Sequence, residues 1–312
     1  FGSYPQLCGR LPIFLCENIS RCEHTGRCHL PVPCVWLEVD KCVKLESMSE
    51  PIDQINLTRW IEAIFPSTES FRQALESGRR LTIYHGIDPT GPHLHLGHAT
   101  NLLLLRRFQD LGHRVIFLVG DFTARIGDPS GKLSARRPLN EAAVRKNFST
   151  FHRQAAKVVR FRGRNGARIV WNSRWLARLR AADLLELMGQ VTVQQMIERD
   201  MFQVRLKAGA PIWLHEFLYP LLQGYDSVAL NVDAEIGGND QTFNMLVGRD
   251  LLKSYRRREK FVIATKLLVN SKTGGKLMNK SEGGLVNLDD KPNEMYGKVM
   301  ALPDEVIFSV AE

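Results

Sequence analysis

A strand that leads into a proline- and glycine-rich turn, and then into a helix with two histidines, constrains the fold of this chain most. The segment reads YHGIDPTGPHLHLGH and occupies residues 84–98. Its surroundings predict a strand over 81–88 and a helix over 94–111. The continuous apolar run RVIFLVG at 114–120 is typical of a buried parallel strand. Strand, helix and strand in this order predict a βαβ unit.

The same alternation continues through the chain and predicts its fold class. Periodicity predicts helices over 53–64, 67–77, 140–159, 175–188, 193–205, 215–230, 241–252 and 293–302, and strands over 169–171, 233–236 and 261–270. We therefore expect an α/β protein, with a Rossmann-like nucleotide-binding parallel sheet and helices on both faces. The stretch over about 147–210 interrupts the alternation, which indicates a helical insertion between the two halves of the sheet. Its apolar helices fit either plain core or a dimer face.

Composition and charge narrow the class of protein. The chain has 312 residues, of which 44% are hydrophobic and 24% charged, and its formal net charge is +9. No apolar run approaches the ~18 residues needed to span a bilayer, and no secretory signal is visible, so we expect a cytoplasmic protein without a membrane partner. The positive excess lies in residues 48–312. A basic body suits a polyanion such as RNA or nucleotide phosphates.

Residues 1–47 differ from the rest of the chain. They contain all six cysteines and equal numbers of acidic and basic side chains. The cysteine spacing has no C-x-x-C pair and fits no zinc pattern, and disulfides would need an oxidising compartment. We expect a disordered or spurious extension here, followed by a main domain over 48–290. Residues 291–312 then form the start of a helical region that is truncated at Glu312.

Two histidines mark the first turn of the helix expected over 94–111. His95 and His98 are three residues apart and share one helix face. Free backbone N–H groups and the positive end of the helix dipole point out of the same place, which suits phosphate. Gly97 would let a flat ring such as adenine approach the backbone. A solvated helix start or a metal site is the alternative, but the carboxyl end of a strand favours ligand binding.

A second group of polar residues lies on the helix expected over 215–230. Tyr219, Gln223 and Asp226 fall at i, i+4 and i+7, on one helix face. The sequence GGNDQ follows at 237–241, and its two glycines would let a ligand reach the backbone. Polar groups on one face among leucines favour a pocket wall over a capped surface helix with a half-buried tyrosine.

Two glycine-rich loops carry lysines suited to phosphate. GDPSGK at 127–132 resembles a phosphate-binding loop but lacks the spacing of a P-loop. GGKLMNKSEGG at 274–284 is flanked by glycine pairs and carries Lys276 and Lys280. Such a loop can move and bring ammonium groups to phosphate. A solvated Lys/Gly loop is the alternative.

Taken in order, these motifs resemble the class I aminoacyl-tRNA synthetases, and the bacterial-type tyrosyl branch in particular. HLGH at 95–98 matches the first family signature, H-[IL]-G-H. LMNKS at 277–281 occupies the position of the second signature, K-M-S-K-S, with Leu277 in place of the first lysine and Asn279 in place of the first serine. The resemblance covers about 52–312 and implies that 48–290 is a class I synthetase catalytic domain.

The resemblance implies activation of L-tyrosine with ATP to tyrosyl-adenylate and pyrophosphate, and transfer of tyrosine to tRNA(Tyr). By matching position it assigns catalysis to Thr90, His95, His98, Lys132, Arg136 and Lys280, and ATP binding to Asp88, Gly97, Asp240, Lys276 and Ser281. It assigns tyrosine binding to Tyr84 and Asp226 at the phenol hydroxyl, Asp128, Tyr219 and Gln223 at the ammonium group, and Gln241 at the carboxylate. His85 and Asn101 line the same region without a firm role. Mg²⁺ is expected with ATP, held mainly by phosphates and water, with no metal site of the protein's own. A homodimer through the insertion is also implied.

Three alternatives share part of this pattern. A tryptophanyl relative has both signatures, but Tyr84 and the polar face that begins at Tyr219 argue against it. A non-catalytic RNA-binding protein on the same fold fits the basic body and the altered LMNKS sequence, yet would not need His95 and His98. A generic nucleotidyltransferase would not explain GGNDQ. Because no complete further domain follows, we expect adenylate formation with weak or absent tRNA charging.

Overall fold

The computed structural model describes residues 59–130, 139–269, 277–278, 285–306 and 310, which all belong to one compact unit, Glu50–Glu312. The extension expected over 1–47 lies outside the described residues, and so do parts of both glycine-rich loops. Among the described helices, none is both long enough and apolar enough to cross a membrane.

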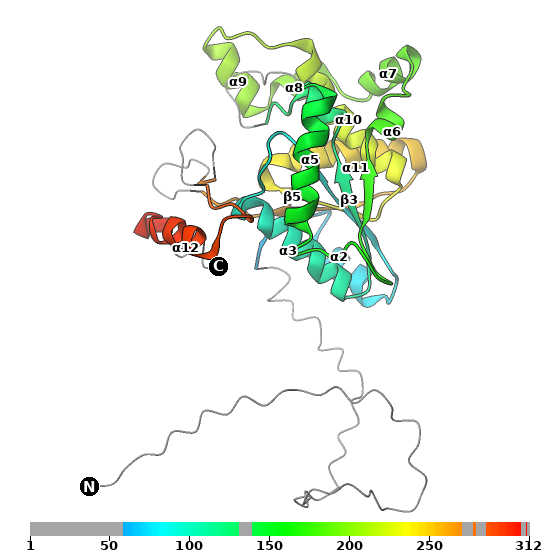
Figure 1. Cartoon of the computed structure of the whole chain (residues 1–312). Coiled ribbons are helices and arrows are strands. Elements are labelled where there is room, and N and C mark those ends of the chain that lie inside the picture. Colours follow the sequence, from blue (N-terminus) through cyan, green and yellow to red (C-terminus); the bar gives the residue numbers. More distant parts are fainter. Residues whose placement is uncertain (1–58, 131–138, 270–276, 279–284, 307–309, 311–312) are drawn as a thin grey trace, which may run out of the picture. The chain divides into compact units, whose positions relative to one another are not determined.

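A six-stranded sheet forms the centre of the described chain (Figure 1). Its order is β1-β6-β5-β2-β3-β4, and only β1 is antiparallel to its neighbour. The bounds are β1 Ile61–Phe65, β2 Thr82–Ile87, β3 Arg114–Val119, β4 Arg168–Trp171, β5 Ala234–Gly238 and β6 Phe261–Thr265. The chain passes from β2 to β3 and β4 on one side, then returns to β5 and β6 on the other. In open α/β sheets, ligands bind where the strand order reverses, outside the carboxyl ends of the strands. In this sheet these are the ends of β2 and β5.

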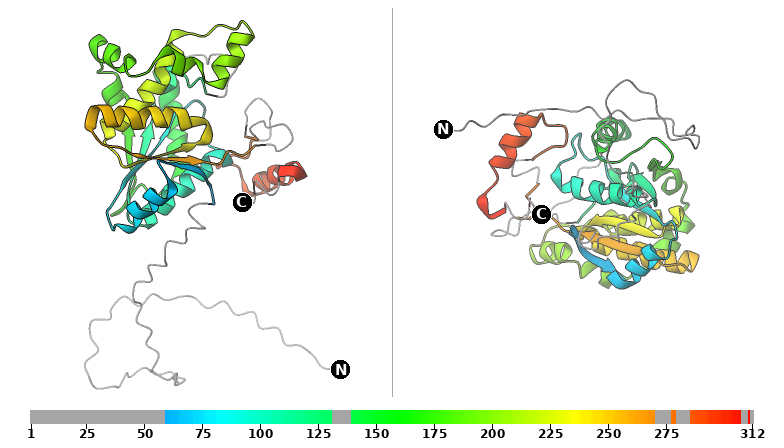
Figure 2. Two further views of the ribbon diagram at one scale, coloured as in Figure 1. Left: turned by 180° about the vertical axis from the view of Figure 1, so that it is seen from behind. Right: turned by 90° about the horizontal axis from the view of Figure 1, so that it is seen from below.

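Helices cover both faces of the sheet, which confirms the predicted α/β architecture (Figure 2). One face carries α2 (Thr68–Glu76), α3 (Leu96–Asp110) and α5 (Glu141–Ala155), and the other carries α10 (Leu214–Leu230) and α11 (Thr242–Arg256). The remaining elements are α4 Thr123–Ile126, α6 Ser173–Leu176, α7 Ala181–Met188, α8 Val193–Ile197, α9 Asp200–Lys207, α12 Pro292–Met300, and the short 3₁₀ turns η2 Asn239–Gln241 and η3 Asp304–Val306.

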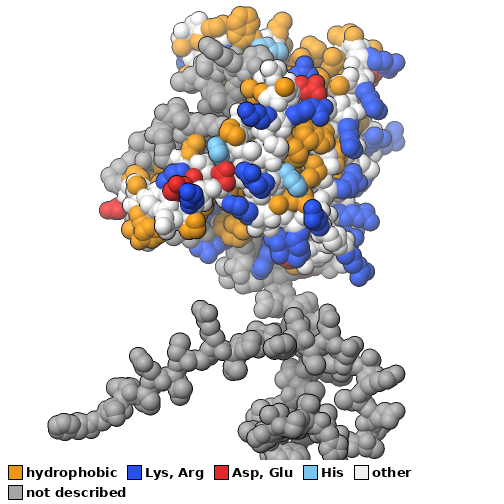
Figure 3. Space-filling view, in the orientation of Figure 1, with side chains coloured by type: hydrophobic (Ala, Val, Ile, Leu, Met, Phe, Trp, Pro, Cys, Tyr) orange, Lys and Arg blue, Asp and Glu red, His pale blue; other side chains and the backbone are white. Residues whose placement is uncertain are grey.

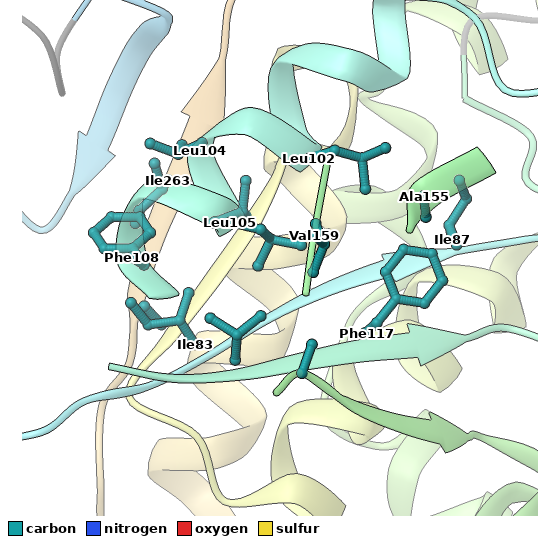
Figure 4. Packing of buried hydrophobic residues seen from close by; sticks show 14 of the residues in the cluster. Ile83, Ile87, Leu102, Leu104, Leu105, Phe108, Phe117, Ala155, Val159 and Ile263 are labelled. Carbon is teal, nitrogen blue, oxygen red and sulfur yellow. The ribbon is translucent and has the colours of Figure 1, made fainter. Parts of the chain in front are cut away.

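Successive strand residues are buried on opposite faces of the sheet. Ile83 and Phe117 pack against α3 and α5 in the main core (Figure 4). Their neighbours Tyr84 and Leu118 pack on the other face, beneath α10. Burial on both faces explains why β3 reads as a continuous apolar run, as parallel strands do. The same alternation delivers Tyr84 to the α10 side of the sheet.

The predicted helix over 53–64 is wrong at its carboxyl end. Residues 61–65 form the edge strand β1, which pairs antiparallel with β6, while residues 53–58 lie outside the described residues. Short apolar stretches fit helical and strand spacing alike, so tertiary pairing decides between them. The strand predicted over 261–270 is also shorter, because β6 ends at Thr265.

The insertion differs from its prediction in detail. The helix expected over 175–188 is interrupted at Arg180, whose extended backbone (φ −83°, ψ 167°) begins α7, with its N–H donating to Asp183 at 2.8 Å. The helix expected over 193–205 is likewise divided by extended Arg199 (φ −65°, ψ 132°). Within the stretch 147–210, α5 and β4 join the layers of the sheet, whereas α6 to α9 lie outside them.

A buried ion pair joins the insertion to α10. Arg205 on α9 donates two hydrogen bonds to Glu216 on α10, at 2.5 and 2.8 Å, and also contacts the carbonyl of Pro211. Both charged side chains are almost completely buried. Since a buried charge without its partner is costly, this pair holds the end of the insertion against the start of α10.

Helices α10 and α11 approach each other at two glycines. A Cβ atom on Gly224 would lie 3.1 Å from the Cα of Gly248, and a Cβ on Gly248 would lie 2.7 Å from Lys260 Nζ and 3.0 Å from Ser227 Oγ. Side chains at either position would force the helices apart. The two glycines therefore bring α10 and α11 into backbone contact and leave room for one buried lysine.

Candidate active site

A cavity of about 550 Å³ opens at the carboxyl ends of β2 and β5, where the strand order reverses. Twelve of the residues predicted from the sequence line it: Tyr84, Asp88, Thr90, His95, Gly97, His98, Asp128, Tyr219, Gln223, Asp226, Asp240 and Gln241. The others, Lys132, Arg136, Lys276, Lys280 and Ser281, lie outside the described residues. One cavity thus gathers predicted side chains from β2, α3, α10 and the segment after β5.

Tyr84 and Asp226 contribute two buried polar groups to this cavity. The hydroxyl of Tyr84 forms a 2.8 Å hydrogen bond with Ser227 Oγ. Asp226 accepts from Trp175 Nε1 at 2.7 Å and from Asn172 Nδ2 at 3.2 Å. Trp175 and Asn172 therefore fix the orientation of the carboxyl group before any ligand binds.

Burial changes the pKa of both groups. It raises the pKa of Asp226 well above its usual value, although the hydrogen bonds from Trp175 and Asn172 act in the opposite direction. Burial, together with the carboxylates of Glu235 and Asp226, also raises the pKa of Tyr84 well above its usual value. The Tyr84 hydroxyl accordingly keeps its proton and can donate it in a hydrogen bond.

Asp88 joins the end of β2 to two other elements. Its carboxylate accepts from Thr123 Oγ1 at 2.7 Å and from the Tyr219 hydroxyl at 2.9 Å. Gly120 makes this possible, because a Cβ there would lie 1.9 Å from Asp88 Oδ1. A third hydrogen bond in this segment is local: the Thr90 N–H donates to the Asp88 carbonyl at 2.7 Å. Asp88 thus holds Tyr219 against the cavity wall.

A chain of amide side chains crosses the cavity wall from α4 to α10. Gln241 Nε2 donates to Asp128 Oδ2 at 2.8 Å, and Asn244 Nδ2 donates 3.0 Å hydrogen bonds to both Gln241 and Gln223. Asp128 also accepts the backbone N–H of Ser130 at 2.9 Å, in a turn. The family resemblance assigns Asp128, Gln223 and Gln241 to tyrosine binding, and hydrogen bonds connect all three with Asn244.

The two histidines stand together at the start of α3. Their ring centroids are 3.9 Å apart, and His98 Nδ1 accepts the backbone N–H of His95 at 3.2 Å. The Cβ that Gly97 lacks would lie 3.1 Å from the His95 ring and 3.7 Å from Met278. Glycine at this position therefore leaves room for the His95 ring over the first helical turn. Both rings line the cavity at the start of the helix.

His85 and Asn101 are buried supports of the same wall. His85 Nδ1 donates to the carbonyl of Ile236 at 2.8 Å, and burial lowers the pKa of its imidazole. Asn101 accepts from Thr265 Oγ1 at 2.7 Å. These bonds connect β2 to β5 and α3 to β6, so both side chains hold the elements that form the cavity.

A charged pair that no sequence pattern indicated lies behind Tyr84. Glu235 on β5 lines the cavity and is 2% exposed, and Lys260, which is 1% exposed, forms an ion pair with it. In the sequence, a glutamate and a lysine at the ends of two apolar runs are expected to face solvent, and no regular spacing connects the two residues. Only the parallel pairing of β5 with β6 brings the two strand starts side by side.

A third missed residue comes from the insertion. Arg199 donates to Ser130 Oγ at 2.8 Å, and its guanidinium lies 4.5 Å from the centroid of the Phe243 ring. Burial lowers the pKa of Arg199 to about 10, partly offset by Asp128. The guanidinium therefore stays charged at neutral pH and anchors the described part of the GDPSGK loop.

Across the described residues, no group of three or more His, Cys, Asp or Glu side chains is arranged to hold a metal ion. The polar groups of the cavity can hydrogen-bond a ligand, and the positive end of the α3 dipole favours an anion near the start of that helix. The arrangement suits a reaction that is driven by positioning and charge stabilisation.

The chain belongs to the class I tRNA synthetases: the family model described as tRNA synthetases class I (W and Y) matches residues 76–310. Within this class its similar curated relatives are called tyrosine–tRNA ligase. The relative from Haemophilus ducreyi is 46% identical over 263 residues, which cover 84% of this chain and 65% of the relative. The relative from Moorella thermoacetica is 43% identical over 259 residues, covering 82% and 62%. The chain therefore spans a little under two thirds of the length of these relatives.

Solved structures show the same fold. The C-terminally truncated mitochondrial tyrosyl-tRNA synthetase of Aspergillus nidulans aligns with a TM-score of 0.67 at 23% identity, covering 81% of this chain and 76% of that one. The tyrosyl-tRNA synthetase of Archaeoglobus fulgidus, solved with L-tyrosine, aligns with a TM-score of 0.63 at 22% identity, covering 83% and 78%. At these identities the likeness supports the fold alone.

Proposed function

We propose that this chain activates L-tyrosine with ATP, giving tyrosyl-adenylate and pyrophosphate, and that it transfers tyrosine to tRNA(Tyr). One observation carries the proposal: Tyr84 and Asp226 place two buried hydrogen-bonding groups in the same cavity as Asp128, Gln241 and the histidine pair. The relatives named tyrosine–tRNA ligase support it. A tryptophan indole offers no hydroxyl to the first pair, which favours tyrosine.

The amino acid is proposed to lie between β2 and α10. Its phenol hydroxyl donates to Asp226 and accepts from Tyr84, while its ammonium group is held by Asp128, with Gln223 and Tyr219 alongside. Gln241 binds the carboxylate. A buried polar pair left without a partner costs free energy, so phenylalanine binds more weakly in this arrangement.

ATP is proposed to occupy the mouth of the cavity beside α3. Thr90 and His95 stabilise charge at the γ-phosphate, His98 supports the nucleotide site, and Asp240 binds the ribose, with Asp88 and Gly97 nearby. From the two glycine-rich loops we propose pyrophosphate contacts by Lys132, Arg136 and Lys280, with Lys276 and Ser281 at the ATP site. Mg²⁺ accompanies ATP and is held mainly by phosphate oxygens and water.

The proposed first step needs no general base. A carboxylate oxygen of tyrosine attacks the α-phosphorus, a new phosphorus–oxygen bond forms, and the bond to pyrophosphate breaks. The attacking group is already ionised, so no proton has to move. Catalysis then comes from alignment of the two substrates and from positive charge at the departing phosphates.

We further propose a cytoplasmic homodimer that binds tRNA. Large apolar side chains are exposed along the insertion and the start of α10: Leu185, Met188, Val193, Val204, Leu206, Trp213 and Leu214. A second copy of the chain would cover them. Lys and Arg predominate over Asp and Glu on the face in Figure 3, and the net charge of +9 suits a polyanionic partner.

The test of the proposed reaction is ATP–pyrophosphate exchange by the 312-residue chain with tyrosine, tryptophan and phenylalanine in parallel. We expect exchange with tyrosine alone. Exchange with tryptophan alone would show that tryptophan, not tyrosine, is the substrate. A folded chain that binds RNA without any exchange would be a non-catalytic RNA binder. Charging of tRNA(Tyr), followed in the same preparation, tests the second step.

A further inference from the structure

The side chains behind Tyr84 form a buried network that nothing in the proposed reaction yet uses. Lys260 lies at the start of β6 and Glu235 on β5, and their side chains are ion-paired, 0% and 3% exposed. Lys260 Nζ also donates to Ser227 Oγ at 2.6 Å and lies 5.6 Å from the centroid of the Tyr84 ring. Ser227 Oγ is in turn 2.8 Å from the Tyr84 hydroxyl.

The direction of these hydrogen bonds follows from the chemistry of the groups. A lysine ammonium group can only donate, so Ser227 accepts from Lys260 and must place its own proton elsewhere. The choices are Tyr84 at 2.8 Å and Glu235 Oε2 at 3.4 Å. Hydroxyl hydrogen bonds favour 2.5–3.0 Å, and Glu235 Oε2 already accepts from Lys260. Ser227 therefore donates to Tyr84.

The pair also decides what happens to the proton of Tyr84. Glu235 raises the pKa of Tyr84 by its charge and as a side-chain hydrogen-bond partner, so a Glu235 carboxylate without Lys260 would hold that proton more strongly and keep it from the cavity. Lys260 neutralises Glu235, and Gln223 Nε2 occupies its other oxygen at 3.3 Å. Both effects weaken the hold of Glu235 on the Tyr84 proton and favour its donation to a ligand in the cavity that Tyr84 lines.

We propose that Lys260, acting through Ser227 and Glu235, is a positioning residue that makes Tyr84 a hydrogen-bond donor to the phenol oxygen of the amino acid. This inference rests on the proposed function. It assigns substrate specificity to a charge that does not touch the substrate. Gly248 belongs to the same arrangement, because any side chain there would collide with the lysine ammonium group.

The test compares tyrosine with phenylalanine in the full chain. In Lys260→Met, we expect the KM for tyrosine in pyrophosphate exchange to rise about tenfold. A tenfold change corresponds to about 1.4 kcal/mol, which is the size of one hydrogen bond. The inhibition constant of phenylalanine and the KM for ATP should stay unchanged. Glu235→Gln combined with Lys260→Met should recover the KM for tyrosine to within about threefold, because it removes the competing carboxylate. The exposed lysine variant Lys253→Met is the matched control and should behave like the unaltered chain.

A second variant keeps the proposal falsifiable if Lys260→Met does not fold. Ser227→Ala removes only the hydroxyl and should also lower the ratio of the phenylalanine inhibition constant to the tyrosine KM towards one. An unchanged preference for tyrosine in Ser227→Ala, or in a folded Lys260→Met, would overturn this inference while leaving the proposed function intact. Absence of tyrosine-dependent exchange in the unaltered chain would overturn the proposed function and this inference with it.

Discussion

The hydroxyl of Tyr219 donates a 2.9 Å hydrogen bond to the carboxylate of Asp88, joining the middle of α10 to the end of β2. This bond crosses the cavity wall at the level where the two halves of the sheet meet. It positions one predicted tyrosine-binding residue by means of one predicted ATP-binding residue, so a change in either should affect both substrates.

Tyr219→Phe should weaken the fold and the site together. Loss of a hydrogen bond to a carboxylate should lower the free energy of unfolding by about 1 to 2 kcal/mol. The KM for tyrosine should rise more than the KM for ATP, because we propose that this part of α10 binds the amino acid. Chemical denaturation and exchange kinetics measure the two effects. Tyr296→Phe, at an exposed tyrosine of α12, is the control, and equal stability of the two variants would contradict the prediction.

Gly120→Ala should be much more damaging than an ordinary glycine substitution. The new methyl group would lie 1.9 Å from Asp88 Oδ1 and 2.5 Å from Thr123 Oγ1, so both side chains must leave their hydrogen bond. We expect a loss of about 1 to 3 kcal/mol in stability and a large loss of exchange activity. Gly297→Ala is the comparison: nothing lies within 4 Å of its Cβ in helix α12, and it should stabilise by about 0.5 to 1 kcal/mol. Similar melting temperatures for both variants would show that the contact at Gly120 is unimportant.

Asp226→Asn should change how stability depends on pH. Because burial raises the pKa of Asp226 in the folded chain, the folded state binds this proton more tightly than the unfolded state. The stabilisation is complete below the unfolded value of ~3.9 and is lost as pH rises towards the folded pKa. The stability of the unaltered chain, relative to Asp226→Asn, should therefore fall between pH 4 and neutral pH. Unfolding curves across this range, with Asp304→Asn as the exposed control, measure the effect, and a constant difference would refute it.

Arg199→Met should impair the site from a distance. The substitution removes the 2.8 Å bond to Ser130 and the contact with Phe243, which hold the turn that carries Asp128. We expect the KM for tyrosine to rise roughly five- to tenfold. Exchange kinetics and melting temperature should be compared with those of Arg145→Met, an exposed arginine on α5. A normal KM in the Arg199 variant would mean that the insertion does not organise this turn.

The fold was largely predictable because both faces of a parallel sheet are buried. Continuous apolar runs such as the one at 114–120, separated by amphipathic helices, are compatible with few other folds. The edge strand β1 was not predictable, since its partner β6 lies about two hundred residues away in the sequence. The breaks at Arg180 and Arg199 were also missed, because an arginine carries no local signal for an extended backbone.

The candidate site was predictable where its residues form local patterns. His95 and His98 share a helix turn, and Tyr219, Gln223 and Asp226 share a helix face, so spacing alone grouped them. The residues that were missed have no such pattern: Glu235 and Lys260 meet only through strand pairing, and side-chain networks of this kind are a property of the assembled fold. The roles predicted for the loop residues stay predictions, because these residues lie outside the described part of the chain: Lys132, Arg136, Lys276, Lys280 and Ser281.

The contact between Gly224 and Gly248 affects how two ligands bind in the same cavity. Helix α10 carries the side chains proposed for the amino acid, and the segment leading into α11 carries Asp240 and Gln241, proposed for the ribose and the carboxylate. Because the backbones of the two helices are in contact at these glycines, we expect the helices to move together. The distance between the positions proposed for the amino acid and for the ribose is then set by the backbone before either ligand binds. Less conformational entropy is left to lose when both ligands arrive.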